Sequence, residues 1–279
     1  MKFKNMEDAL KYVQKDILRE IDRICTKHGL RYYLAYGTLI GAIRHGGFIP
    51  WDDDIDIMMP YDDMLRFAQL CKTELDPKFF YQSPETEEEY RLTINRVRRN
   101  DSVLSEPTLV GKKVHQGIMV DIYPLFGAAQ GKFSRRLQVL RAMKRALYLL
   151  DEPVKNHGFL MKAGSSVLLK LKTKRGKAKA ARRLTEKFAA LSFDQSPLVT
   201  VLDSGIKEMS TTYRREWFGD GVRHKFDEDE FMVPANADAV LRRYFGDYMV
   251  LPPENERVFH HNYLEIKMPP DAEVEGGAD

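Results

Sequence analysis

Four aspartates lie within a window of five residues, at Asp52, Asp53, Asp54 and Asp56. We expect a strand over Ile55–Met59, and alternation along it would point two of these carboxylates, Asp54 and Asp56, to one face. Hard oxygen ligands at this spacing suit Mg²⁺ or Mn²⁺. The alternative is a solvated acidic loop or an incidental Ca²⁺ site. Mutual repulsion of the carboxylates beside an apolar strand favours the metal site.

A third carboxylate that could complete this site is Asp121. It is the acid within an otherwise apolar segment, Ile118–Tyr123, which we expect to be a strand. A buried, unpaired carboxylate would cost several kcal/mol, so a cation or hydrogen-bond donors should lie near it. Metal ligation or catalysis is the favoured role, and a salt bridge to an arginine is the alternative.

An anion site is predicted at Gly37-Thr38. This pair ends the strand-like segment Arg31–Tyr36 and begins a short apolar helix, Leu39–Arg44. Backbone N–H groups at such a turn can bind phosphate. A phosphate held there could bridge to a metal on the neighbouring strand.

Cationic side chains are expected to neutralise that phosphate and the charge of a leaving group. Histidine can also contact phosphate or complete a metal site, although a structural role is the commoner one for such a pair. The residues assigned to this group are Arg44, His45, Arg96, Arg98, His260 and His261.

The elements that must position these residues indicate an α/β fold. Apolar residues at three- and four-residue steps predict a helix that Asn5 caps and Gly29 ends. Further helices are expected over Asp62–Leu75 and from Asn236 to Phe245. A length of 279 residues and 43% hydrophobic content are enough for a full core.

Charge divides the chain into regions. Gly131–Lys187 holds 17 Lys or Arg against three acids, whereas the remainder holds 27 basic and 38 acidic residues. We therefore expect a catalytic core over residues 1–130, a basic helical insertion over 131–191, a part completing the core over 192–268, and a disordered tail over 269–279.

The basic insertion also carries apolar residues at helical spacing, which favours contact with an anionic membrane surface. The alternative is that its apolar stripe packs on the catalytic domain. Nucleic-acid binding fits poorly, because the basic run has few aromatic residues for stacking.

The compartment is expected to be cytoplasmic, with the protein peripheral at the inner face of the membrane. Cys25 and Cys71 are isolated, which speaks against a disulfide framework. The sequence contains no signal-peptide pattern and no apolar stretch of membrane-spanning length.

Three blocks of the sequence resemble the LicD family, which includes fukutin and fukutin-related protein. They are Tyr36–Ile57, Gly117–Leu125 and Tyr244–Pro253. The resemblance implies a nucleotidyltransferase-like fold, a mixed sheet flanked by helices. It also implies transfer of a phospho-substituent, such as phosphocholine, from a CDP-linked donor to a hydroxyl of a cell-surface glycan or its lipid-linked precursor, with release of CMP.

Residue by residue, the resemblance implies metal ligation by Asp54, Asp56 and Asp121, with Gly37 and Thr38 at the phosphate-binding turn. For proton removal from the acceptor hydroxyl, Asp121 or Asp52 is expected to be the base.

Two other functions stay open at this point. A nucleotide-sugar glycosyltransferase also uses an Asp-x-Asp motif, but that motif normally follows a longer nucleotide-binding half than the fifty or so residues present here. A non-catalytic membrane-surface adaptor would need only the basic helices, and the complete set of acids argues against it.

Overall fold

The computed structural model describes the chain except for residues 151–168, 171–172, 204, 260–261 and 276–279. It forms two compact units. Unit 1 comprises Met1–Tyr90, Asn95–Tyr123 and Glu216–Asp279, and unit 2 comprises Arg91–Ile94 and Pro124–Arg215.

A β-sheet flanked by helices forms the centre of unit 1, which confirms the predicted α/β class. The strand order is β2-β3-β7-β5-β4, and the β2–β3, β7–β5 and β5–β4 pairs are antiparallel. The strands are β2 (Tyr33–Leu34), β3 (Asp56–Pro60), β4 (Phe79–Gln82), β5 (Asn95–Arg99) and β7 (Met119–Gly127).

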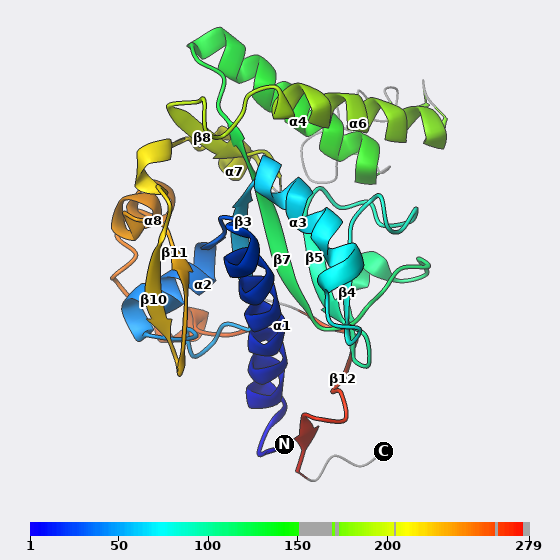
Figure 1. Ribbon diagram of the computed structural model, residues 1–279, viewed down its shortest axis with the longest axis vertical. Coiled ribbons are helices and arrows are strands. Elements are labelled where there is room, and N and C mark those ends of the chain that lie inside the picture. Colours follow the sequence, from blue (N-terminus) through cyan, green and yellow to red (C-terminus); the bar gives the residue numbers. More distant parts are fainter. Residues whose placement is uncertain (151–168, 171–172, 204, 260–261, 276–279) are drawn as a thin grey trace. The chain divides into compact units, whose positions relative to one another are not determined.

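Helices α1 (Met6–His28) and α3 (Tyr61–Glu74) pack beside this sheet (Figure 1). The Asn5 side chain caps α1 by accepting from the Asp8 amide, and Gly29, at φ +61°, ends it, as predicted. The periodic apolar residues of α1 are at most 4% exposed. Each such side chain contributes roughly 1.5–3 kcal/mol through burial, which fixes α1 against the core.

The chain turns into a helix immediately after β2. Helix α2 (Tyr36–Ile40) runs directly into a π-helical turn, η1 (Gly41–His45). The predicted strand over 31–36 is thus shorter than expected, because Tyr36 already belongs to the helix.

The C-terminal part of unit 1 contains a hairpin, a helix and short pairings. The N-cap of α8 is Asn236, as predicted. The elements are β10 (Val222–Phe226), β11 (Asp229–Val233), α8 (Ala237–Phe245), η4 (Glu254–Glu256) and β12 (Glu265–Lys267), which pairs with β6 (Val103–Ser105). Two short 3₁₀ turns are η2 (Pro107–Leu109) and η3 (Arg215–Trp217).

The tail differs from the predicted disorder over 269–279. Strand β13 (Glu273–Val274) pairs in parallel with β1 (Lys2–Phe3), and Ala272 is fully buried. The N-terminal amine also donates to the Asp271 carbonyl at 2.7 Å. The prediction was wrong for residues 269–275 because composition does not reveal that the N-terminal strand supplies backbone partners.

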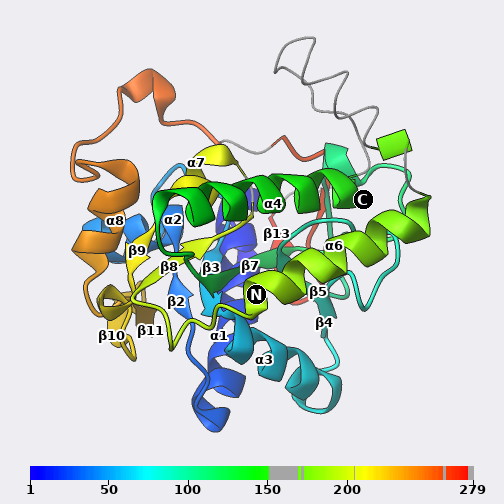
Figure 2. The same cartoon turned by 90° about the horizontal axis from the view of Figure 1, so that it is seen from above.

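Unit 2 is built from helices and the far end of β7. Strand β7 pairs with β8, which pairs with β9. Helices α4 and α6 pack side by side, and their shared apolar core includes Tyr148 and Ala181 (Figure 2). The elements are α4 (Lys132–Leu150), α6 (Lys174–Ala189), β8 (Leu198–Val201), α7 (Ile206–Ser210) and β9 (Tyr213–Arg214).

The division into units falls elsewhere than the composition-based boundaries at residues 130 and 191. Residues 192–215 belong with the basic helices in unit 2, because β8 and β9 extend the sheet from β7 there. None of the helices in the described parts of the chain combines the length and apolar character needed to cross a bilayer.

Candidate active site

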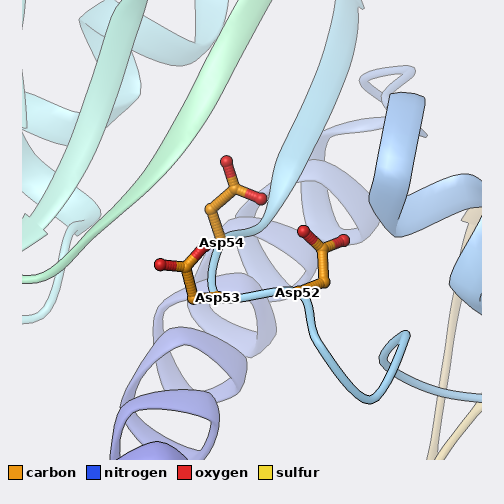
Figure 3. A group of neighbouring side chains, drawn as sticks. All are labelled: Asp52, Asp53 and Asp54. Atoms are coloured by element: carbon orange, nitrogen blue, oxygen red, sulfur yellow. The ribbon is translucent and has the colours of Figure 1, made fainter. Parts of the chain in front are cut away.

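The acidic loop, Asp52–Asp54, lies directly before β3 (Figure 3). Each of its three aspartates has a carboxylate oxygen within 4.8 Å of one from the others. Figure 3 shows the carboxylates of Asp52 and Asp54 extending to the same side of the loop. The Gln14 amide fixes the loop by donating to the Asp53 carbonyl at 2.8 Å.

The predicted strand geometry of the aspartates was only partly right. Asp56 is the first residue of β3, whereas Asp54 precedes the strand, so the two are not successive same-face residues of one strand. In the part of the chain that the structure describes, the triplet meeting the 4.8 Å spacing is the acidic loop, not Asp54, Asp56 and Asp121. Positions 52–55 have no regular secondary structure, and the strand begins only at Asp56.

Asp56 and Asp121 nevertheless lie beside this loop on adjacent strands. The Asp121 amide donates to the Ile55 carbonyl at 3.0 Å, which joins β7 to the residue before β3. Burial, followed by the charges of Asp54, Asp121 and Asp52, raises the pKa of Asp56 well above its usual range. The negative charges of Asp54, Asp121 and Asp52 thus all oppose ionisation of Asp56.

The site fits a divalent cation. Asp56 is 9% exposed, and none of the described residues donates a hydrogen bond to its buried Oδ1. Unpaired buried carboxylates are costly, and oxygen ligands of this kind suit Mg²⁺. A cation would satisfy this oxygen and relieve the repulsion from Asp54 and Asp121.

Asp121 also forms the predicted alternative contact, a salt bridge. It stands opposite Arg96 in the β5–β7 register, and Arg96 Nε lies 2.7 Å from Asp121 Oδ1. Arg96 is 4% exposed and also pairs with Glu106. A guanidinium with two carboxylate partners is a structural cation that orients Asp121.

Arg98 is not available to a phosphate. It is fully buried, and its guanidinium donates to the Gln82 side chain and the Gly117 carbonyl and pairs with Glu106. The predicted phosphate role is therefore wrong for Arg98. Arg96 and Arg98 lie two residues apart on β5, and both pair with Glu106.

Gly37 and Thr38 contact the aspartates directly. A Cβ on Gly37 would lie 2.5 Å from Asp52 Oδ2, so the absence of a side chain there lets the Asp52 carboxylate approach the backbone. The Thr38 hydroxyl is buried and accepts from the Asp56 amide at 2.9 Å. These two residues thus position Asp52 and Asp56.

Arg44 and His45 lie in η1 beside Trp51, which precedes the acidic loop. The His45 and Trp51 rings are 6.1 Å apart, and the Arg257 guanidinium lies 5.5 Å from the Trp51 ring. Burial and the charge of Arg44 lower the pKa of His45, and burial and the charge of Arg257 lower the pKa of Arg44. These cationic groups therefore gather around Trp51, the residue before the acidic loop. His260 and His261 lie outside the described residues.

Three tyrosines adjoin the acids, and together we call Tyr36, Tyr123 and Tyr244 the tyrosine cluster. The Tyr36 ring lies 5.2 Å from that of Tyr123 and 5.4 Å from that of Tyr244. Burial, then Asp56 and Asp121, raise the pKa of Tyr123 well above its usual range.

Sequence reasoning missed Glu106, Arg257 and Tyr244 as site residues. Tyr244 begins a block that carried the family resemblance, Tyr244–Pro253, and this was the available signal. Nothing local in the sequence marks Glu106 or Arg257, because their partners come from other strands and loops.

Comparison with known proteins finds relatives for the segment that carries these acids. Residues 29–126 match the family model for the LicD/FKTN/FKRP nucleotidyltransferase domain. The chain is 28% identical over 258 residues to the lipopolysaccharide cholinephosphotransferase LicD of Haemophilus influenzae, covering 88% of this chain and 92% of that protein. It is 38% identical over 60 residues to the human ribitol 5-phosphate transferase FKRP, covering 22% of this chain and 12% of that protein. The segment that holds the acidic loop, Asp56 and Asp121 therefore lies within the part of the chain that matches this family model.

Proposed function

We propose that the protein transfers a phospho-substituent from a CDP-linked donor to a hydroxyl of a cell-surface glycan or its lipid-linked precursor. The observation that carries this proposal is the convergence of Asp52, Asp54, Asp56 and Asp121 within the LicD-matched segment. The relative that aligns with most of the chain is named as a cholinephosphotransferase.

We assign Asp54, Asp56 and Asp121 to a site for Mg²⁺ or Mn²⁺. When bound, such an ion neutralises charge on the donor diphosphate and on the leaving group. Arg96 holds Asp121 in place from β5, and Thr38 holds the Asp56 backbone. Arg44 and His45, in η1, would contact the outer phosphate oxygens of the donor.

In the proposed reaction the acceptor oxygen attacks the distal phosphorus of the donor. The bond from that phosphorus to the bridging oxygen breaks, and CMP leaves with the electron pair. The hydroxyl proton passes to a carboxylate of the site, Asp52 or Asp121. Positioning and electrostatics provide most of the acceleration in such transfers.

We further propose that unit 2 contacts an anionic membrane surface. The apolar faces of α4 and α6 largely pack on one another, but Phe133 and Leu140 stay 80% and 60% exposed. Exposed cations cover the other side of α6 and could bind anionic lipid headgroups. They are Lys174, Arg175, Lys179, Arg182, Arg183 and Lys187.

The test is CMP release from a panel of CDP-linked compounds with purified glycan acceptors. Release should require Mg²⁺ or Mn²⁺, stop with EDTA, and be lost in Asp54→Asn. Turnover of UDP-sugars with no turnover of any cytidine nucleotide would overturn the proposal in favour of a glycosyltransferase.

A further inference from the structure

We infer that a pocket in unit 2 binds a single phospholipid molecule, with the end of an alkyl chain inside the pocket and the phosphate head group at its open side. The lining residues that carry the argument all belong to unit 2, and we call the space between them the α4–α6 pocket. They are Phe133, Leu137, Arg141, Lys187, Phe188 and Leu191. The inference rests on the proposed membrane contact and gives it a specific lipid site.

The walls of the α4–α6 pocket are apolar. Phe133 and Leu137 come from α4, and Phe188 comes from the last turn of α6, which lies beside α4 (Figure 2). The pocket has a volume of about 180 Å³. Since an apolar cavity of about 150 Å³ holds one benzene molecule, this volume has room for about six carbon atoms of an alkyl chain. Phe188 is 1% exposed and Phe133 is 80% exposed, so the pocket extends from the interior of unit 2 to the solvent.

The buried polar side chain that lines the pocket already has partners. Gln138 is 3% exposed, and its amide donates to the Gly127 carbonyl at 2.9 Å. Its oxygen accepts from the Ala129 amide at 2.8 Å and from Arg135 at 2.7 Å. Because the Gln138 amide is committed to these contacts, the inner part of the pocket suits hydrocarbon better than a sugar or a base.

Positive charge gathers at the open side of the pocket. Arg141 and Lys187 both line it, and Lys187 is exposed. In the described parts of the chain, no carboxylate forms an ion pair with either of them. Glu186, the acid of α6, lies 3.6 Å from Arg182 instead. Two cations without a carboxylate partner therefore adjoin an apolar cavity, and basic pockets of this kind bind anionic lipid head groups.

Arg141 differs from the arginines of α4 that hold unit 2 together. Helix α4 has six cations and no acid. Arg135 donates to the Thr200 hydroxyl at 2.8 Å, and Arg145 pairs with Asp203. Among the described residues Arg141 has no contact of this kind, which leaves its guanidinium available to a phosphate.

A membrane lipid fits this combination better than other anions. Phe133, Leu137 and Leu140 recur at four- and three-residue steps and therefore share one face of α4. Phe133 and Leu140 are exposed, so this face can contact the bilayer from which the lipid comes. A free phosphate would leave the apolar walls unused, and an uncharged lipid would leave Arg141 and Lys187 unused.

The experiment titrates the full chain with hexyl phosphate, 1-hexanol and inorganic phosphate by calorimetry. Hexyl phosphate combines an alkyl chain with the anion, and each of the other probes lacks one of these parts. Wild type should bind hexyl phosphate at least about tenfold more tightly than either of the others. Phe133→Ala and Arg141→Gln should each weaken this binding about tenfold, because one removes an apolar wall and the other removes a cation.

Arg136→Gln is the matched control, because Arg136 is an exposed cation of α4 that does not line the pocket. It should bind hexyl phosphate like wild type. In co-sedimentation with phosphatidylglycerol vesicles, Arg141→Gln should also lose more binding than Arg136→Gln, although both variants lose the same charge.

Equal affinities of wild type, Phe133→Ala and Arg141→Gln for hexyl phosphate, or no preference for it over the other probes, would overturn the inference. Equal losses of vesicle binding in Arg141→Gln and Arg136→Gln would do the same and would leave only a diffuse electrostatic membrane contact. Absence of vesicle binding in wild type would overturn the membrane contact itself, and the lipid site with it. None of these results bears on CMP release, which tests phosphotransfer separately.

Discussion

Asp56 is the residue whose surroundings most favour a bound cation. In the part of the chain that the structure describes, no group donates to its buried Oδ1, and its neighbours Asp54 and Asp121 repel its charged form. In the absence of a metal, the ionised side chain therefore destabilises the fold, whereas a bound cation would reverse the sign of this contribution.

Replacing Asp56 with Asn should consequently change stability and activity in opposite directions. In EDTA, Asp56→Asn should raise the free energy of unfolding by about 1–2 kcal/mol, because a buried charge is removed. Mg²⁺ should raise the Tm of wild type and leave that of the variant unchanged. CMP release should fall by at least about 1000-fold.

Thermal unfolding with and without Mg²⁺ provides the measurement. Asp247→Asn is the control, because the Asp247 side chain is 63% exposed and its substitution removes no buried charge. A wild-type Tm that does not respond to either Mg²⁺ or Mn²⁺ would contradict the metal assignment.

Gly37 offers a second test at the residue scale. A methyl group at this position would lie 2.5 Å from Asp52 Oδ2, so Gly37→Ala should push the carboxylate away from the backbone. We expect kcat to fall about 100-fold, as misplacing a reacting group by about 1 Å can do. Stability should change little, because alanine favours the helix that begins there.

Circular dichroism would check that Gly37→Ala keeps its fold and stability. The value of kcat, measured on the same preparation, would check the expected loss of activity. Wild-type kcat in Gly37→Ala would exclude Asp52 from proton removal.

At the scale of elements, the site depends on how β3, β5 and β7 are aligned. The β5–β7 register puts Arg96 opposite Asp121, and the β7 backbone bonds to Ile55 next to Asp56. A slip of one residue would turn Arg96 to the other face and leave Asp121 without its cation.

Arg96→Met should therefore be strongly destabilising, by about 3–5 kcal/mol, because two carboxylates would lose their buried partner. Urea unfolding measures this change. Arg66→Met is the matched control, since Arg66 is 60% exposed and lies 3.7 Å from Asp63, where an ion pair contributes at most about 1 kcal/mol. Equal effects of the two substitutions would show that Arg96 does not organise the sheet.

At the scale of the whole molecule, acidic and basic side chains gather in different parts of the chain and suit two different functions. The acids of unit 1 suit a metal and a phosphorylated donor, while the exposed cations of α6 suit an anionic surface. Because each cation near such a surface contributes about 1 kcal/mol, a few of them determine whether the protein binds.

Co-sedimentation with vesicles of graded anionic lipid content should show binding that rises with that content and falls with salt. Arg182→Glu with Arg183→Glu should weaken binding by at least about tenfold. The same reversal at Arg66 and Lys72, on α3, is the control and should have a smaller effect. Binding that ignores both lipid charge and salt would remove the membrane role and leave phosphotransfer untouched.

The sequence by itself determined the elements whose signals are local. Asn5, Gly29 and Asn236 mark helix ends because capping depends on a few neighbouring residues. The aspartates were also identifiable locally, since a dense group of acids beside apolar residues has few explanations. The family resemblance rested on the same contiguous segment, residues 36–57.

Tertiary structure alone decided which side chains meet. Strand pairing joined Arg96 to Asp121 and placed Arg98 in the core, although both arginines look alike in sequence. It ordered residues 269–275 through β1, and it brought Tyr36 and Tyr244 into contact across more than two hundred residues. These outcomes depend on long-range pairing and on burial, which a local pattern of residues does not encode.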